Sequence, residues 1–123
     1  MSEKNFKALI VWLIANGKTE KALEILSKRY HVESPRLHVG LPKKHKKKTL
    51  GCYTSNNKTI NVLNSDVLKE PFVILHEFYH HLRIGLDNKH RGTEKHANEF
   101  AAQFIKAYKA STAMNESTEG NDI

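Results

Sequence analysis

Apolar residues in the first third of the chain recur three and four positions apart, the spacing of one face of an α-helix. The pattern predicts a first helix that ends at Asn16 and Gly17, because glycine readily adopts the left-handed conformation that stops a helix. A second helix is predicted over residues 19–29, before Pro35 breaks the pattern. The apolar positions of both helices are Phe6, Leu9, Ile10, Leu13, Ile14, Ala22, Leu23, Ile25 and Leu26. We expect these helices to act as scaffold.

The middle of the chain changes to short segments that favour β-structure. Residues 36–41 predict a short strand. Residues 49–53 and 59–63 flank the turn-forming residues 55–58, so we expect them to form a hairpin.

Two more helices follow the hairpin. The first should cover residues 70–84, with Pro71 in its first turn and Gly85 at its end. Its apolar stripe, Phe72, Leu75, Phe78, Tyr79 and Leu82, should pack against the sheet. The second should begin after Thr93 as N-cap and end near Ala110.

The predicted elements make a small α+β fold. We expect a single domain over residues 1–110, followed by an acidic, flexible tail over residues 111–123. Cys52 is the only cysteine, which excludes an internal disulfide and fits a reducing compartment. No apolar run reaches the length of a membrane span. We therefore predict a soluble, cytoplasmic protein without a membrane partner.

The charge of the chain is unevenly distributed. The net charge is +7, and the run from Lys43 to Lys48 holds five lysines and one histidine. The last thirteen residues carry acidic side chains and no lysine or arginine. This pattern favours an anionic partner, such as nucleic acid contacted through the lysine run, or attraction between tail and body. A solvated basic loop is the ordinary alternative.

The predicted third helix contains an H-E-x-x-H motif formed by His76, Glu77 and His80. Residues four apart lie on the same face of a helix, so both imidazoles can bind one ion. Glu77 lies next to the first histidine without pointing at the ion, where a general base for a zinc-activated water is needed. Zinc needs a third protein ligand and one open position.

The third ligand has to come from another part of the chain. Candidates are Glu94, His90, His96, Glu99 and His81. His81 lies about 100° around the helix from His80 and should point away. Glu94 shares a helical stripe with two alanines that permit a close approach to the motif helix. A carboxylate on a packed face needs a partner, and zinc would be one, so we favour Glu94.

These parts resemble a known group of enzymes. The motif from His76 to His80, followed by the phrase from Glu94 to Ala101, is similar to gluzincin-type zinc peptidases, in particular the ImmA/IrrE family and the small minigluzincins. The resemblance covers about residues 36–108. It implies a minimal zincin-like fold with N-terminal helices, a small sheet, a motif helix and a C-terminal glutamate helix.

The resemblance also implies a function. The protein would be a zinc-dependent endopeptidase that hydrolyses peptide or protein substrates with a metal-activated water. One Zn²⁺ would be bound by His76, His80 and Glu94, with Glu77 as catalytic base and acid. Substrate would lie along an edge strand. Minigluzincins are latent enzymes blocked by their own C-terminal segment, so residues 111–123 could play that part here.

Some parts of the family pattern have no clear counterpart in this chain. The last helix lacks the leucine-rich phrase ending in Met-Pro that ImmA/IrrE proteins have. The residue that stabilises the oxyanion or contacts substrate stays open among Tyr53, His90, Arg91 and Tyr79.

Two other functions remain open. One is a DNA-associated protease similar to SprT proteins, with His90 as third ligand. The other is a non-enzymatic, zinc-stabilised interaction module, although such a site has no use for Glu77.

Overall fold

The computed structural model describes residues 1–42, 49–83 and 93–121, with side chains as far as Thr112. In chain order its elements are α1 (Glu3–Ala15), α2 (Thr19–Arg29), β1 (Arg36–Val39), β2 (Gly51–Thr54), β3 (Thr59–Val62), the 3₁₀-helix η1 (Ser65–Lys69), α3 (Pro71–Arg83) and α4 (Thr93–Asn121). The α+β class predicted from the sequence is confirmed. None of the described helices combines the length and the apolar character that crossing a membrane requires.

The three strands form one sheet in the order β1-β3-β2. The predicted hairpin is confirmed, because β2 pairs antiparallel with β3 across the turn. The first strand, β1, pairs parallel with β3 and aligns Leu37 with Ile60. The strand β2 therefore forms one edge of the sheet, and β1 forms the other.

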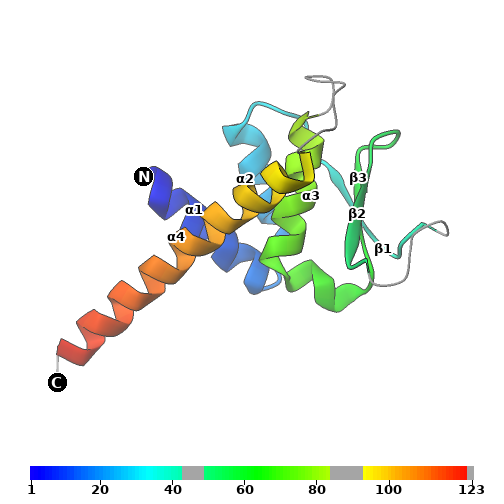
Figure 1. Ribbon diagram of the computed structural model, residues 1–123. Helices are drawn as coiled ribbons and strands as arrows, with labels where there is room; N and C mark the ends of the chain where they lie inside the picture. Colours follow the sequence, from blue (N-terminus) through cyan, green and yellow to red (C-terminus); the bar gives the residue numbers. More distant parts are fainter. Residues whose placement is uncertain (43–48, 84–92, 122–123) are drawn as a thin grey trace.

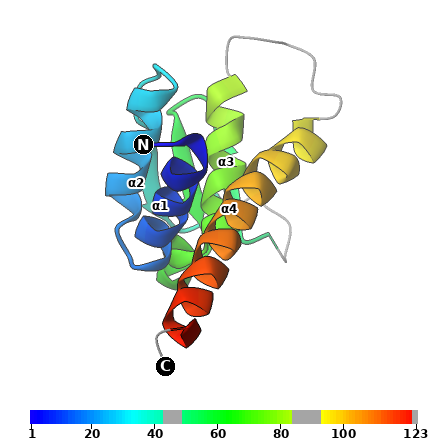
Figure 2. The ribbon, with the colours of Figure 1, turned by 90° about the vertical axis from the view of Figure 1, so that its left-hand side faces the viewer.

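All four α-helices lie on one side of the sheet, with α3 directly beside it (Figure 1). The helix α4 packs across both α1 and α3, and a view from the side shows α1, α3 and α4 next to one another (Figure 2). The largest fully buried side chains come from every layer: Phe78, Phe104, Ile10, Ile14, Leu23, Leu26, Ile60, Ile74, Leu75 and Val62. This shared core fixes the position of α3 between the sheet and α4.

Gly51 allows the edge strand β2 to approach α3 closely. A Cβ atom at this position would lie only 2.8 Å from Cγ1 of Val73 and 3.2 Å from the backbone oxygen of Asn61. Such contacts are too short for any other residue to fit without a shift of the strand or the helix. The same position lies 3.7 Å from Cγ of Glu77, so β2 passes directly beside the H-E-x-x-H motif.

Two helix predictions are wrong in detail. The helix α4 does not end near Ala110 but continues to Asn121, since no glycine or proline interrupts the chain between Thr93 and Gly120. Thr93 is also the first helical residue rather than the cap.

One member of the predicted apolar stripe is exposed, and two others, Tyr79 and Leu82, are half-buried. Phe72 is 42% exposed. It lies in the first turn of α3, where its ring contacts His76 instead of the core.

Candidate metal centre

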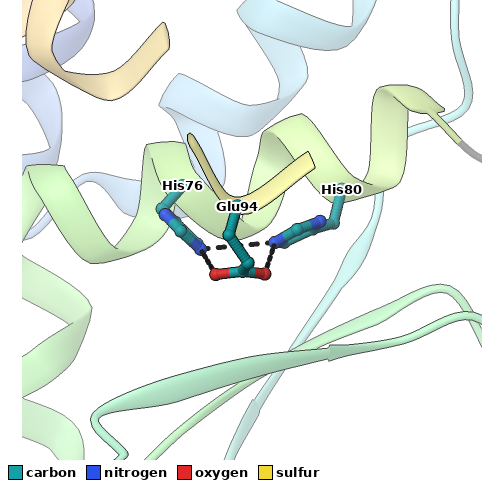
Figure 3. Close-up of side chains that lie close together, drawn as sticks. All are labelled: His76, His80 and Glu94. Carbon is teal, nitrogen blue, oxygen red and sulfur yellow. Dashed lines mark hydrogen bonds and ion pairs between the residues drawn. The ribbon is translucent and has the colours of Figure 1, made fainter. Parts of the chain in front are cut away.

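Two histidines and one glutamate converge where α3 meets the start of α4. His76 and His80 lie one turn apart on α3, and their Nε2 atoms are 3.3 Å apart. The carboxylate of Glu94, from the first turn of α4, reaches both rings (Figure 3). Its Oε2 lies 3.0 Å from Nε2 of His76, and its Oε1 lies 2.9 Å from Nε2 of His80. Of the candidates for a third ligand that lie within the described residues, Glu94 is the one that the fold brings to the histidine pair.

The packing of α4 on α3 places Glu94. Ala97 and Ala101 are fully buried, and their small side chains let the two helices approach closely, as predicted. The expectation that Glu94 itself lies on the packed face is wrong, since its side chain is 76% exposed. The buried face of α4 begins one turn later, at Ala97, so Glu94 reaches the histidines from the solvent side.

The donor atoms of this group suit a zinc ion. The three residues each offer one ligand atom, and these atoms all lie within 4.8 Å of one another. Two nitrogens bound tetrahedrally to zinc lie about 3.3 Å apart, because each Zn–N bond is about 2.0–2.1 Å long. The two Nε2 atoms have this separation. Burial lowers the pKa of His80, which favours the neutral imidazole that binds metals.

Asn98 holds the first histidine in a suitable orientation. Nδ1 of His76 lies 2.9 Å from Oδ1 of Asn98, one turn after Glu94 on α4. When Nδ1–H donates this hydrogen bond, the lone pair of Nε2 faces the cluster. This role of Asn98 was not predicted from the sequence, although its spacing of four from Glu94 places both residues on one helical face.

We expect Asn98→Ala to weaken zinc binding by about 10- to 100-fold without abolishing it, as losses of such orienting partners do. Competition with a chromogenic chelator measures the affinity. The matched control is Glu99→Ala, the neighbouring exposed residue on α4. Equal zinc affinities for the two variants would mean that Asn98 does not orient His76.

Glu77 is a buried carboxyl beside the histidines. It is only 7% exposed and is not one of the three grouped donors. Burial raises its pKa to about 7, and the nearby Glu94 carboxylate adds to the shift. A carboxyl with this pKa can accept and release a proton near neutral pH. Glu77 is thus a buried carboxyl, next in sequence to His76, whose pKa lies near neutral pH.

His81 does not take part in the cluster, and the prediction that it points away is confirmed. Both of its ring nitrogens have other partners: Nε2 lies 2.6 Å from the backbone oxygen of Glu33, and Nδ1 lies 2.7 Å from the hydroxyl of Tyr53. The ring is buried and links α3 to β2. The Tyr53 hydroxyl is thus held by His81, and burial and the Glu33 charge raise its pKa to about 12.

The other candidates divide into three groups. His96 and Glu99 are exposed on α4 and lie outside the grouped donors. His90, Arg91 and the run from Lys43 to Lys48 lie outside the described residues, so their predicted roles stay predictions. Tyr79 is half-buried, and its ring packs against Phe100.

Comparisons of this chain with protein families, curated proteins and solved structures find no match. The assignment of a function therefore rests on the chain's own residues.

Proposed function

We propose that this protein is a zinc-dependent endopeptidase. The observation that supports the proposal is the convergence of His76, His80 and Glu94 beside the buried carboxyl of Glu77. A site that only stabilises a fold prefers four protein ligands, whereas three ligands with an adjacent base suit hydrolysis. The resemblance to gluzincins agrees with this proposal and stays a prediction.

The residues of the site have distinct tasks. His76, His80 and Glu94 would hold the ion, which supplies a Lewis acid that polarises a peptide carbonyl and acidifies water. Glu77 takes the proton of the attacking water and delivers it to the leaving amine. Its pKa of about 7 suits both steps, because the carboxylate and the carboxylic acid are both accessible at neutral pH.

Among the described residues, no strand pairs with the outer edge of β2, so this edge is a suitable place for an extended peptide. The backbone N–H of Leu63 donates to the oxygen of Leu50 at 2.8 Å, so residues 50 and 63 form a hydrogen-bonded pair. Such pairs alternate along an antiparallel ladder, and the backbone groups of Gly51 and Tyr53 therefore point away from β3. A peptide paired with Gly51 would run past Glu77, which supports a substrate bound as an added strand.

Residues 111–123 could block the metal centre only after a conformational change. The backbone of residues 111–121 continues α4, and this end of the helix lies opposite the end that carries Glu94 (Figure 1). Inhibition of a chain by its own tail would require the end of α4 to unwind. We expect deletion of residues 111–123 to raise the hydrolysis rate if this occurs. An unchanged rate would remove the tail from regulation.

A peptidase assay with controlled zinc content tests the proposed function. The protein is stripped with a chelator, reloaded with zinc, and incubated with an unfolded protein of mixed sequence, and mass spectrometry identifies new termini. We expect cleavage in the zinc-loaded sample and none in the stripped sample. A chain that retains zinc but yields no cleavage, with or without residues 111–123, would contradict the proposal.

A further inference from the structure

The face of the sheet turned away from α3 contains a groove that the metal centre does not use. Successive side chains along a strand point to opposite faces of the sheet. Gly51 faces α3, so the residues directly before and after it in β2 point to the opposite face. The groove has a volume of about 420 Å³. Its lining consists of Arg36, Leu37, His38, Gly40, Leu41, Pro42, Asn57, Thr59 and Asn61.

Within the part of the chain that the structure describes, the lining of this groove is basic and contains no carboxylate. Arg36 and His38 both lie exposed on the edge strand β1. The carboxylate of Glu33, which is close enough to interact with the Arg36 charge, already forms an ion pair with Lys58 at 2.9 Å. Among the described residues, the guanidinium of Arg36 forms no ion pair, so it is available to an external anion.

The floor of the groove is polar and held in place. Asn61 is only 5% exposed, and its amide nitrogen lies 3.3 Å from Oγ1 of Thr54 and 3.4 Å from the backbone oxygen of Thr59. The hydroxyl of Thr59 donates to the backbone oxygen of Asn57 at 3.0 Å. This network fixes the strand that carries the floor and keeps the groove hydrophilic.

In the sequence, further positive charge follows a residue that lines the groove. Pro42 lines it, and the run from Lys43 to Lys48 begins at the next residue. As a feature of the sequence, this run favours a ligand that carries several negative charges. A net charge of +7 and a pI near 9.5 agree with such a ligand.

We propose that this groove binds nucleic acid through its phosphodiester backbone, with Arg36 and His38 as contacts. A guanidinium donates two parallel hydrogen bonds to a phosphate, and amide and hydroxyl groups are common additional phosphate contacts. The proposal is independent of the peptidase assignment, since the groove and the metal centre lie on opposite faces of the sheet.

Fluorescence anisotropy with a labelled oligothymidylate of about 20 nucleotides tests the proposal. The titrations are run in chelator, so that the state of the metal centre does not matter, and over a range of salt concentrations. For Arg36→Gln we expect affinity to fall several-fold and the salt slope to shrink by about 1, equally for oligothymidylate and oligoadenylate. His38→Gln should also weaken binding, and Arg36→Lys should restore the slope.

The matched control is Lys109→Gln, which removes one exposed charge from α4 on the other side of the protein. Circular dichroism checks that every variant is folded, and His38→Gln decides the test if Arg36→Gln does not fold. Equal affinities for the groove variants and the Lys109 control would overturn the proposal. Binding that depends on the lysine run but not on Arg36 and His38 would also overturn the proposal. Polyglutamate that competes as well as oligothymidylate would assign the groove to acidic protein instead.

Discussion

Replacement of Glu77 by glutamine is expected to leave zinc bound and to lower kcat/KM for peptide hydrolysis by about 100- to 10,000-fold, the usual contribution of a general acid–base group. Glutamine has nearly the same shape and keeps the packing against β2, but it cannot take a proton from water. The carboxyl of Glu77 is buried beside His76 and is not among the three grouped donors, so zinc content should not change.

The measurement combines steady-state kinetics with metal analysis of the same samples. Glu99→Gln is the matched control, because it makes the same chemical change at an exposed position on α4. It should keep both zinc and activity. A Glu77→Gln variant that hydrolyses peptide at the wild-type rate would remove Glu77 from the mechanism.

The same substitution is expected to stabilise the zinc-free protein at alkaline pH. The pKa of Glu77 is about 7 in the folded chain, against an ordinary value of 4.5. A carboxyl with a raised pKa binds its proton more tightly in the folded state, so its contribution to stability is complete below about pH 4.5. That contribution is lost as the pH rises toward 7. The loss is about 3 kcal/mol, from 1.36 kcal/mol per pKa unit.

Urea denaturation in the presence of a chelator measures this effect. The unfolding free energy of the wild type should fall by about 3 kcal/mol between pH 4.5 and pH 8, relative to that of Glu77→Gln. Glu99→Gln should follow the wild type, because residue 99 is exposed. Parallel pH profiles for the wild type and Glu77→Gln would show that Glu77 is ionised without cost in the folded state.

The buried carboxyl of Glu77 lowers the stability of the folded chain when it is ionised. A side chain that lowers stability at neutral pH has no packing advantage over glutamine, so its presence is better explained by chemistry. Perturbed acidity, burial and an adjacent group of metal donors occur together at Glu77.

The local parts of the fold were predictable from the sequence. Helical spacing of apolar residues predicted α1, α2 and α3, and turn residues between β-prone segments predicted the hairpin of β2 and β3. The parallel pairing of β1 with β3 was not predictable, since it joins segments far apart in the chain and leaves no local pattern. The end of α4 was not predictable, because the chain after Ala110 is polar and poor in apolar residues, which by itself does not indicate a helix.

The candidate metal site could be predicted from the sequence to a similar extent. Spacing within one helix fixed the pair His76 and His80, and the alanine stripe singled out Glu94 from other candidates. The exposure of Glu94 and the role of Asn98 depend on how two helices meet, which a single sequence does not specify. The link between Tyr53 and His81 likewise depends on the packing of β2 against α3.

Zinc content per chain is the most direct test of the proposed metal centre. The wild type, Glu94→Ala and His90→Ala are dialysed against a mild chelator and analysed for bound metal. We predict one zinc per chain in the wild type and in His90→Ala, and loss of zinc in Glu94→Ala, because the carboxylate of Glu94 contacts both histidines. Zinc that is lost with His90→Ala but kept with Glu94→Ala, or that is absent from the wild type, would contradict this account.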